Sequence, residues 1–242
     1  MRVAELTPVS LDELDRRAAL LRRVDTKYVV ELETLHELLD RLPEEHDVLE
    51  IDGRHEFGYE TTYFDTPDLR CFHDHVEGTR PRFKARTRYY VDTGRCVFEV
   101  KIKNPDDEMD KRQIKHAPRW RRKLTRRAAD FLDHSLRDTG IDPPGEMEAS
   151  LRTRFRRLTL AARDGADRIT CDFDVELSRG RRTARMKSGL ALVETKSAHG
   201  HSPADRVLNE LGAEPVSLSK YVAGIALLAG SDQPEPERRF FD

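Results

Sequence analysis

The stretch RPRFKARTRYY, residues 80–90, alternates cationic residues with apolar or small ones. A β-strand points successive side chains to opposite faces, so alternation of this kind predicts a strand with one charged face. The charged face of this predicted strand carries four cations and no anion, namely Arg82, Lys84, Arg86 and Arg88. The opposite face carries Phe83, Ala85, Thr87 and Tyr89.

Four further segments show the same alternation, in CVFEVKIK (96–103), RITCDFDVEL (168–177), LALVETKS (190–197) and RVDTKY (23–28). Their charged faces carry Glu99, Lys101 and Lys103; Arg168, Asp172, Asp174 and Glu176; Glu194 and Lys196; and Arg23, Asp25 and Lys27. One-sided alternation usually means an antiparallel sheet with a buried face and a solvated face. The signs of the charges decide whether that reading holds here.

Like charges side by side on a sheet repel one another, and an ordinary solvated face mixes both signs. Residues 79–104 instead hold eight Lys or Arg against two acids. This basic character is local, because 36% of the 242 residues are charged and the formal net charge is only -2. A phosphate-rich ligand between the cations would relieve their repulsion. Because such cations repel one another without a ligand, we expect alanine at Arg86 or Arg88 to leave stability unchanged or slightly higher. The alternative is that they pair with Asp172 and Asp174 in a buried network, in which case the substitution would cost about 3 to 5 kcal/mol.

The periodicity predicts one domain over 20–229, preceded by a helical segment in 1–19 and followed by a disordered tail over 230–242. Strands are expected at 22–30, 57–65, 80–91, 95–103, 150–160, 167–177, 182–187 and 189–196. Helices are expected at 11–22, 33–41, 123–138, 203–212 and 219–229, the first after a Ser10 cap. The polar, proline-containing tail carries little that would order it.

Composition narrows the class of protein. The three cysteines, Cys71, Cys96 and Cys171, form no CxxC pair, which argues against a zinc site or a disulfide framework and favours a cytoplasmic location. No leader or membrane-spanning apolar run is visible, so we expect no membrane insertion, and any membrane attachment would need a separate membrane-protein partner. Aromatic residues make up 7% and do not interleave with the basic face, so nucleic acid is not an expected partner.

Two smaller motifs are more simply explained as parts of the surface than as functional sites. The HxH pairs His73/His75 and His199/His201 offer metal-ligand spacing, but such pairs more often lie on a surface or in a loop. The basic segment RWRRKLTRR, 119–127, is expected to be a solvated face. An acidic partner, a membrane or an emerging polyanion is the alternative interpretation of that segment.

Seven short motifs in this order resemble the VTC domain, the catalytic domain of polyphosphate polymerases: RVDTKY (23–28), YETTYFDTPD (59–68), RFKARTRYY (82–90), FEVKIK (98–103), RITCDFD (168–174), LVETKS (192–197) and LSKY (218–221). The resemblance covers roughly residues 20 to 228. It implies membership of the triphosphate tunnel metalloenzymes, which also include CYTH phosphatases and RNA triphosphatases. The implied fold is α+β, a closed antiparallel barrel of eight strands with helices outside and the charged faces inward.

The resemblance also implies roles for individual residues. Arg86, Arg88, Lys101 and Lys220 are the expected catalytic residues. Further phosphate-binding residues are expected to be Arg23, Lys27, Arg82, Lys84, Lys103, Arg157, Arg168 and Lys196. Glu194 matches the metal-binding glutamate of the family, and Asp172, Asp174 and Glu99 are further candidate ligands for Mn²⁺ or Mg²⁺. For Asp172 and Asp174, ion pairing with arginines is an equal alternative.

The implied function is metal-dependent transfer of the ATP γ-phosphoryl group to a growing chain of inorganic polyphosphate. Two alternatives use the same cations. A hydrolase would cleave tripolyphosphate or nucleoside triphosphates with water, and a non-catalytic module would only bind polyphosphate. The ExExK signature of the CYTH branch is absent from the sequence, which argues against a simple triphosphatase of that branch.

Overall fold

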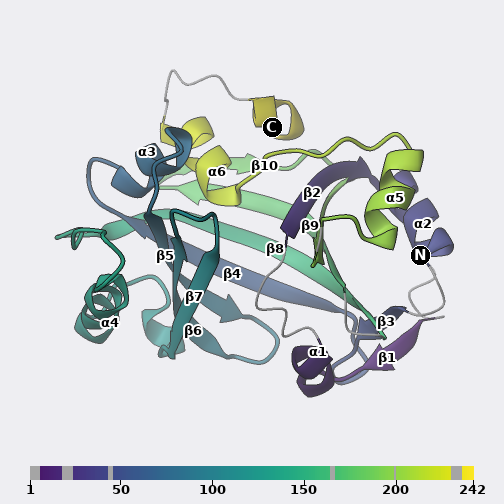
Figure 1. Ribbon diagram of the computed structural model, residues 1–242, viewed down its shortest axis with the longest axis horizontal. Helices are drawn as coiled ribbons and strands as arrows, with labels where there is room; N and C mark the ends of the chain where they lie inside the picture. Colours follow the sequence, from purple (N-terminus) through teal and green to yellow (C-terminus); the bar gives the residue numbers. More distant parts are fainter. Residues whose placement is uncertain (1–5, 18–23, 43–45, 164–166, 199, 230–235) are drawn as a thin grey trace.

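The protein is described by a computed structural model that covers residues 6–17, 24–42, 46–163, 167–198, 200–229 and 236–242. Within these ranges it is an α+β protein with six α-helices and one 11-stranded, mainly antiparallel sheet. Figure 1 shows the sheet running through the centre with the helices around it. None of the described helices combines the length and apolar character needed to cross a membrane.

Eight strands form the main hydrogen-bonded path, in the order β2-β11-β9-β8-β4-β5-β6-β7. Their bounds are β2 Val24–Glu31, β4 Glu56–Asp65, β5 Arg82–Tyr90, β6 Cys96–Lys103, β7 Met109–Lys115, β8 Glu148–Ala162, β9 Arg168–Arg179 and β11 Leu190–Ser197. Three short strands lie off this path: β1 Thr7–Val9, β3 His46–Leu49 and β10 Arg182–Arg185. The long β8 pairs with both β4 and β9 and so joins the two halves of the sheet.

The path ends at β2 on one side and β7 on the other, and no strand ladder joins these two strands in the described residues. The expected closed barrel is therefore not confirmed, whereas the α+β class and the large antiparallel sheet are. The membership of the path also differs from expectation. The predicted strand at 182–187 is β10, a hairpin partner of β9 outside the path, and β7 takes its place.

β7 was not expected because its sequence, MDKRQIK, is polar on both faces. As an edge strand it has a single strand neighbour, β6, and needs no continuous apolar face. Ile114 on this strand nevertheless packs against the main core cluster. The other predicted strands and the long helices lie within a few residues of their expected positions.

Helices cover the apolar faces of the strands. α3 (Arg70–Val76), α4 (Arg126–Leu136) and α6 (Lys220–Ala229) pack over one apolar cluster that includes Phe83, Phe98 and Ile102. α2 (Leu32–Arg41) and α5 (Pro203–Glu210) cover a second cluster around Tyr28, Leu160 and Val193. The apolar half of each alternating strand thus faces the helices, and the charged half is left for the concave side.

The described parts of the two chain ends agree with expectation only in part. α1 covers Leu11–Arg17, and the remainder of the helix predicted to 22 lies outside the described residues. The tail is not disordered over 236–242, where Pro236–Phe240 form a 3-10 helix. Phe241 is buried and bridges to Met186, because two adjacent aromatic residues find space against the main core. The unexpected α3 begins after Asp65, whose carboxylate accepts the backbone N–H of Cys71 (2.8 Å) and Phe72 (3.1 Å).

Candidate functional site

The concave side of the sheet encloses a cavity of about 450 Å³. All eight strands of the main path line it, including Lys27 of β2 and Lys111 of β7 at the two ends of the path. The sheet therefore curls far enough for its edge strands to face the same space. On β5 the lining extends from Arg82 to Tyr90, a length of roughly 26 Å at the usual strand rise.

The described residues that line this cavity include thirteen Lys or Arg against five Asp or Glu. Fourteen of the sixteen predicted site residues are among them: Lys27, Arg82, Lys84, Arg86, Arg88, Glu99, Lys101, Lys103, Arg157, Arg168, Asp172, Glu194, Lys196 and Lys220. Arg23 lies outside the described residues. Asp174 is described but does not line the cavity. The five carboxylates leave a surplus of eight cations, and the low dielectric of the wall strengthens their field.

Arg86 is not the unpaired cation that the sequence suggested. It stands opposite Glu99 across the β5–β6 ladder, and its Nε donates to Glu99 Oε2 at 2.6 Å. Both side chains are almost fully buried, with 9% and 2% of their surface exposed. Burial by itself would raise the pKa of Glu99, but Arg86, then Arg88 and Lys101, lower it well below its usual range. Glu99 is consequently an ionised partner of Arg86, and this pairing occupies the carboxylate that we had considered for metal.

Arg88, two residues along the same face, is held differently. Its Nε is buried without a hydrogen-bond partner among the described residues, and its guanidinium lies over the Tyr59 ring, 5.5 Å from the centroid. Tyr59 in turn stacks on Phe155, with the two rings 5.2 Å apart and nearly parallel. Arg88 is thus positioned by an aromatic surface, and its charge remains directed at the cavity.

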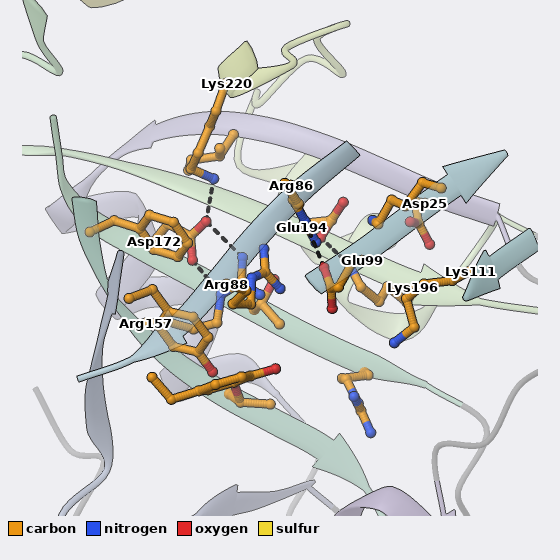
Figure 2. Close-up of a pocket in the computed structure, with 18 of the residues that line it drawn as sticks. Asp25, Arg86, Arg88, Glu99, Lys111, Arg157, Asp172, Glu194, Lys196 and Lys220 are labelled. Atoms are coloured by element: carbon orange, nitrogen blue, oxygen red, sulfur yellow. Dashed lines mark hydrogen bonds and ion pairs between the residues drawn. The ribbon is translucent and has the colours of Figure 1, made fainter. Parts of the chain in front are cut away.

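Asp172 is the anionic centre of a second group in the wall (Figure 2). Its Oδ1 and Oδ2 accept Arg157 Nε at 2.5 Å and Nη2 at 2.8 Å, and Oδ2 also accepts Lys220 Nζ. Burial opposes ionisation, but Arg157 and then Lys220 lower the pKa of Asp172 to about 2. Of the two readings left open for Asp172, the structure places it in the ion pair.

Lys220 is the first residue of α6, and the next residue, Tyr221, anchors the start of that helix. Tyr221 donates its hydroxyl to Asp65 Oδ2, the same buried carboxylate that caps α3. Asp65 therefore connects the end of β4, the start of α3 and the start of α6. Asp65 thus acts as a support for Lys220, while Tyr63 of the same motif lines the cavity.

Glu194 on β11 lies in the cavity, paired with Lys196 on its own strand and opposite Lys27 on β2. Burial raises the pKa of Glu194, but Lys196 and then Lys27 and Arg157 bring it well below the usual value, so the carboxylate is ionised. Asp25 also lines the cavity and is the register partner of Lys196 on β2. Figure 2 labels Asp25, Glu194 and Lys196 in this part of the wall.

No group of three or more His, Cys, Asp or Glu in the described residues is arranged to hold a metal ion. Mg²⁺ and related ions, however, are commonly held by one or two carboxylates together with phosphate oxygens. Glu194, with 19% of its side chain exposed, fits an ion of that kind. These residues suit a metal ion whose remaining ligands are phosphate oxygens. They do not by themselves supply a full set of protein ligands.

The prediction that Asp174 contributes to this site is wrong. The β8–β9 register shifts between Arg154 and Arg156, opposite this part of β9, and Asp174 has a φ of 51°. Its side chain is 68% exposed and pairs with Arg156 at 2.7 Å on the other side of the sheet. Simple alternation assigns Asp172 and Asp174 to one face, but the bulge turns the second carboxylate outward.

Several lysines of the wall have a lowered pKa, because burial and neighbouring cations disfavour their charged form. Burial, followed by the nearby charge of Lys27 and Arg86, lowers the pKa of Lys84 to about 7. Arg86, with burial and Arg88, lowers the pKa of Lys101 well below its usual value. Lys84 Nζ has Ser219 Oγ as a partner at 3.2 Å. A polyanion in the cavity would restore the missing counter-charge.

Sequence reasoning missed several residues of the wall, among them His75, Arg95 and Lys111. His75, expected in a loop or on the surface, lies on α3 and lines the cavity, and its Nδ1 is buried without a hydrogen-bond partner in the described part of the chain. Burial and then Lys84 and Lys27 lower its pKa to about 3, so the ring is neutral near pH 7. Lys111 was missed with the rest of β7. His73 does not line the cavity, and His199 lies outside the described residues.

The family model of the VTC domain matches residues 22–229, which is most of the chain. The chain belongs to the VTC domain family. The resemblance noticed in the seven motifs is thereby confirmed, and the matched region of this VTC domain contains the cavity wall from β2 through α6. No curated protein matched the chain.

Among solved structures, this VTC domain is similar to a candidate adenylate cyclase from Vibrio parahaemolyticus, with 15% identity over 84% of this chain and 97% of that one, and a TM-score of 0.47. A candidate adenylyl cyclase from Hippeastrum, described as having a dominant triphosphatase activity, matches with 16% identity over 88% and 97%, also with a TM-score of 0.47. The RNA triphosphatase of S. pombe matches with 10% identity over 86% and 82%, with a TM-score of 0.30.

Proposed function

We propose that this protein is a polyphosphate polymerase-like enzyme that transfers the γ-phosphoryl group of ATP to a growing chain of inorganic polyphosphate. The observation that carries the proposal is the surplus of cations in one cavity lined by all eight strands of the path. Such a wall suits a flexible chain of negative charges better than a small neutral substrate. Membership of the VTC domain family supports the same substrate class.

Phosphoryl transfer requires little covalent chemistry from the protein, and catalysis consists mainly of alignment and charge neutralisation. Arg88, Lys101 and Lys220 would hold the phosphoryl group in transfer and the leaving phosphates. Lys27, Lys84, Lys196 and the remaining predicted phosphate-binding residues of the wall would hold the rest of the chain. Arg86 and Arg157 keep their ion pairs with Glu99 and Asp172. They would therefore act through the free edges of their guanidinium groups.

In the proposed reaction a terminal oxygen of the polyphosphate chain bonds to the γ-phosphorus as the bond to the β–γ bridging oxygen breaks. ADP leaves with that oxygen and its electron pair, and the chain is one phosphate longer. A phosphate nucleophile is largely ionised near neutral pH, so no dedicated base is required. Mn²⁺ or Mg²⁺ held by Glu194 and phosphate oxygens would supply additional positive charge.

The cavity would work as a tunnel, with the curled sheet enclosing the phosphate chain although no strand ladder among the described residues closes the sheet. We place this activity in the cytoplasm, where ATP is available and where three free cysteines suit the redox conditions. A separate membrane-protein partner would be needed for any membrane attachment.

The test is to incubate the purified protein with ATP and Mn²⁺ and to resolve the products. Accumulating polyphosphate supports the proposal, whereas orthophosphate alone identifies a hydrolase that uses water in the same cavity. Neither product, with tripolyphosphate still bound, identifies a binding module. Arg88→Ala should lower turnover by about a hundredfold or more. Arg41→Ala on α2 is the matched control, since that arginine lies outside the cavity with 50% of its side chain exposed, and it should leave turnover unchanged.

A further inference from the structure

A second concentration of arginines lies on the outer side of the sheet, away from the cavity wall. Glu60 on β4 is almost fully buried, with 6% of its side chain exposed. Three guanidinium groups share its carboxylate: Arg121 at 3.3 Å, Arg122 at 3.0 Å and Arg154 at 3.3 Å. One carboxylate cannot balance three cations, so this outer arginine cluster, Arg121, Arg122 and Arg154, carries a local surplus of two positive charges.

The surplus extends to a fourth arginine. Arg152 is the next residue on the same face of β8, and its Nε is buried without a hydrogen-bond partner among the described residues. Burial, then Arg122 and Arg154, lower the pKa of Arg152. Glu60 and Glu176 counter this shift only in part, and Glu176 is itself paired with Arg185 at 3.0 Å, so the arginines keep a net positive potential.

The arginines of the cluster are held in place by contacts with the sheet. The segment that carries Arg121 and Arg122 follows a 3-10 helix, Pro118–Trp120, and is fixed to β5 because Thr87 Oγ1 donates to the Arg121 carbonyl oxygen. The Arg121 guanidinium also lies over the Tyr89 ring, 5.1 Å from its centroid. Part of the basic segment 119–127, expected as a solvated face, is therefore packed against the sheet.

A surface hollow of about 440 Å³ adjoins the cluster and includes Arg121 and Arg154 in its lining. Arg156 lines it too, but Glu56 and Asp174 pair with that arginine at 2.5 Å and 2.7 Å. The cluster remains half open to solvent, with side-chain exposures of 33% for Arg121, 47% for Arg122 and 52% for Arg154. An anion can therefore reach these three groups without any rearrangement of the core.

The hollow also adjoins the cavity. Gly58, Tyr59 and Phe155 line both spaces, and the hollow further includes Tyr89 and Val91 where β5 ends. The rim of the cavity at this end of the β5–β6 hairpin is thus shared with the hollow that holds the outer arginine cluster. A flexible polyanion that passes over this rim would meet a second group of surplus cations.

We propose that the outer arginine cluster is a second binding site for inorganic polyphosphate, which takes the part of a long chain that lies beyond the cavity. The inference rests on the proposed function, because it requires that the cavity itself takes up phosphate chains. Polyphosphate, and not a compact anion, is the expected ligand because one chain can contact the cavity and the cluster together. Such linked contacts raise affinity without requiring either site to be strong alone.

The test compares tripolyphosphate, which is short, with long-chain polyphosphate on the full-length protein. Arg122→Gln with Arg154→Gln removes two surplus charges and leaves Arg121 on Glu60, so the buried carboxylate keeps a partner. We expect affinity for the long chain to fall roughly tenfold and its salt dependence to weaken by about two units of slope. Affinity for tripolyphosphate should stay unchanged. Arg41→Gln with Arg206→Gln removes the same charge from α2 and α5 and should change neither affinity.

Glu60→Gln should change the affinity for long-chain polyphosphate in the opposite direction. It removes the anion that competes with polyphosphate for the arginines, so affinity for the long chain should increase even though repulsion in the cluster lowers stability. Equal losses for both ligands in the arginine variant, or a long-chain affinity equal to that of the control, would overturn the inference. So would arginine-dependent binding to anionic lipid vesicles without any change for long-chain polyphosphate.

The two proposals fail differently. If the wild-type protein binds neither phosphate ligand, the proposed function fails and the outer site fails with it. If the wild-type protein binds both ligands while the arginine variant matches its control, the cavity function stands and the outer site alone is wrong.

Discussion

Arg86 and Arg88 occupy the same face of β5, two residues apart, yet they differ in what balances their charge. Arg86 is in a buried ion pair with Glu99, whereas Arg88 lies over Tyr59 with its Nε unpartnered in the described chain. Removing one member of a buried pair leaves the other charge without compensation in a poorly solvated place. The two arginines should therefore respond differently to the same substitution.

We predict that Arg86→Ala lowers the free energy of unfolding by about 3 to 5 kcal/mol because it strands Glu99. Arg88→Ala should change it by less than about 1 kcal/mol, since relief of repulsion offsets the lost packing of its stem. Denaturant unfolding of both variants measures this. Adding Glu99→Gln to Arg86→Ala should restore part of the loss, and a cost for Arg88→Ala as large as that for Arg86→Ala would contradict the assignment.

Glu194 can be separated from the other carboxylates of the wall by its metal dependence. Glu194→Gln keeps the shape of the side chain but loses the charge, so turnover should need a higher Mn²⁺ concentration while tripolyphosphate binding without metal is retained or improved. A metal titration of turnover, with calorimetry in the presence of a chelator, checks both. An unaltered metal dependence would assign the ligand role to Asp25, because Asp172 is held in its ion pair and Asp174 lies outside.

Lys84 should make phosphate binding depend on pH. Its pKa is lowered to about 7, chiefly by burial and then by Lys27, and a bound polyanion would raise it again. Below pH 7 the side chain is already charged and binding takes up no proton there. Above pH 7 binding should take up a proton, and affinity should fall as the pH rises.

Calorimetry of tripolyphosphate binding at pH 8, in buffers of different ionisation enthalpy, counts the protons taken up. Lys84→Arg provides a charge that does not titrate in this range, so uptake should decrease while affinity is kept. Other lysines with lowered pKa, such as Lys101, can account for the uptake that remains. Identical proton uptake by the wild type and Lys84→Arg would contradict the role of Lys84.

At the scale of elements, the placement of α6 depends on a close contact with β8. A Cβ added at Gly224 would lie 2.5 Å from Leu151 Cδ2 and 2.7 Å from its Cδ1, and Leu151 is 2% exposed. The helix therefore approaches the sheet as closely as it does because residue 224 has no side chain. Lys220 begins the same helix, so the position of the cation in the cavity follows from this packing.

We predict that Gly224→Ala destabilises the protein by about 1 to 3 kcal/mol through overpacking, even though alanine favours helix by roughly 1 kcal/mol. It should also weaken tripolyphosphate binding, because α6 is displaced and carries Lys220 with it. Thermal unfolding and calorimetry measure the two effects. Leu151→Val in the same protein should recover both, and a variant that is more stable than the wild type would refute the close approach.

At the scale of the whole molecule, the curled sheet concentrates like charges in one enclosed space. The net charge of the chain is only -2, so this concentration comes from arrangement and not from composition. The surplus cations of the wall repel one another, and a bound phosphate chain would remove that repulsion. Ligand binding and stability should consequently be linked through electrostatics.

Tripolyphosphate at about 100 times its dissociation constant should raise the melting temperature by about 5 to 10 °C at low salt. The increase should shrink strongly in 1 M NaCl, where charges are screened over about 3 Å. Differential scanning calorimetry measures both, with orthophosphate at equal ionic strength as the control. A rise that is insensitive to salt, or none at low salt, would remove the electrostatic basis of the site.

The local periodicity of side chains was sufficient to predict most strands, the long helices and much of the cationic wall, while Arg157 and Lys220 came from the resemblance of the motifs. Strand period is a property of neighbouring residues, so rows such as Arg82 to Arg88 are visible without any knowledge of the rest of the chain. The ordered motifs likewise indicated the VTC domain, and its family match confirms that reading. These features depend on the residue pattern within short segments, which does not change with the tertiary structure around them.

Tertiary structure decided what each charge faces. The β5–β6 register decides which residue pairs with Arg86, and a bulge excludes Asp174 from the cavity. The packing of α3 on β5 decides where His75 lies. β7 enters the wall because the sheet curls until both of its edges face one cavity. Register, bulges and curvature arise from contacts between residues far apart in the sequence, and periodicity within a segment carries no information about them.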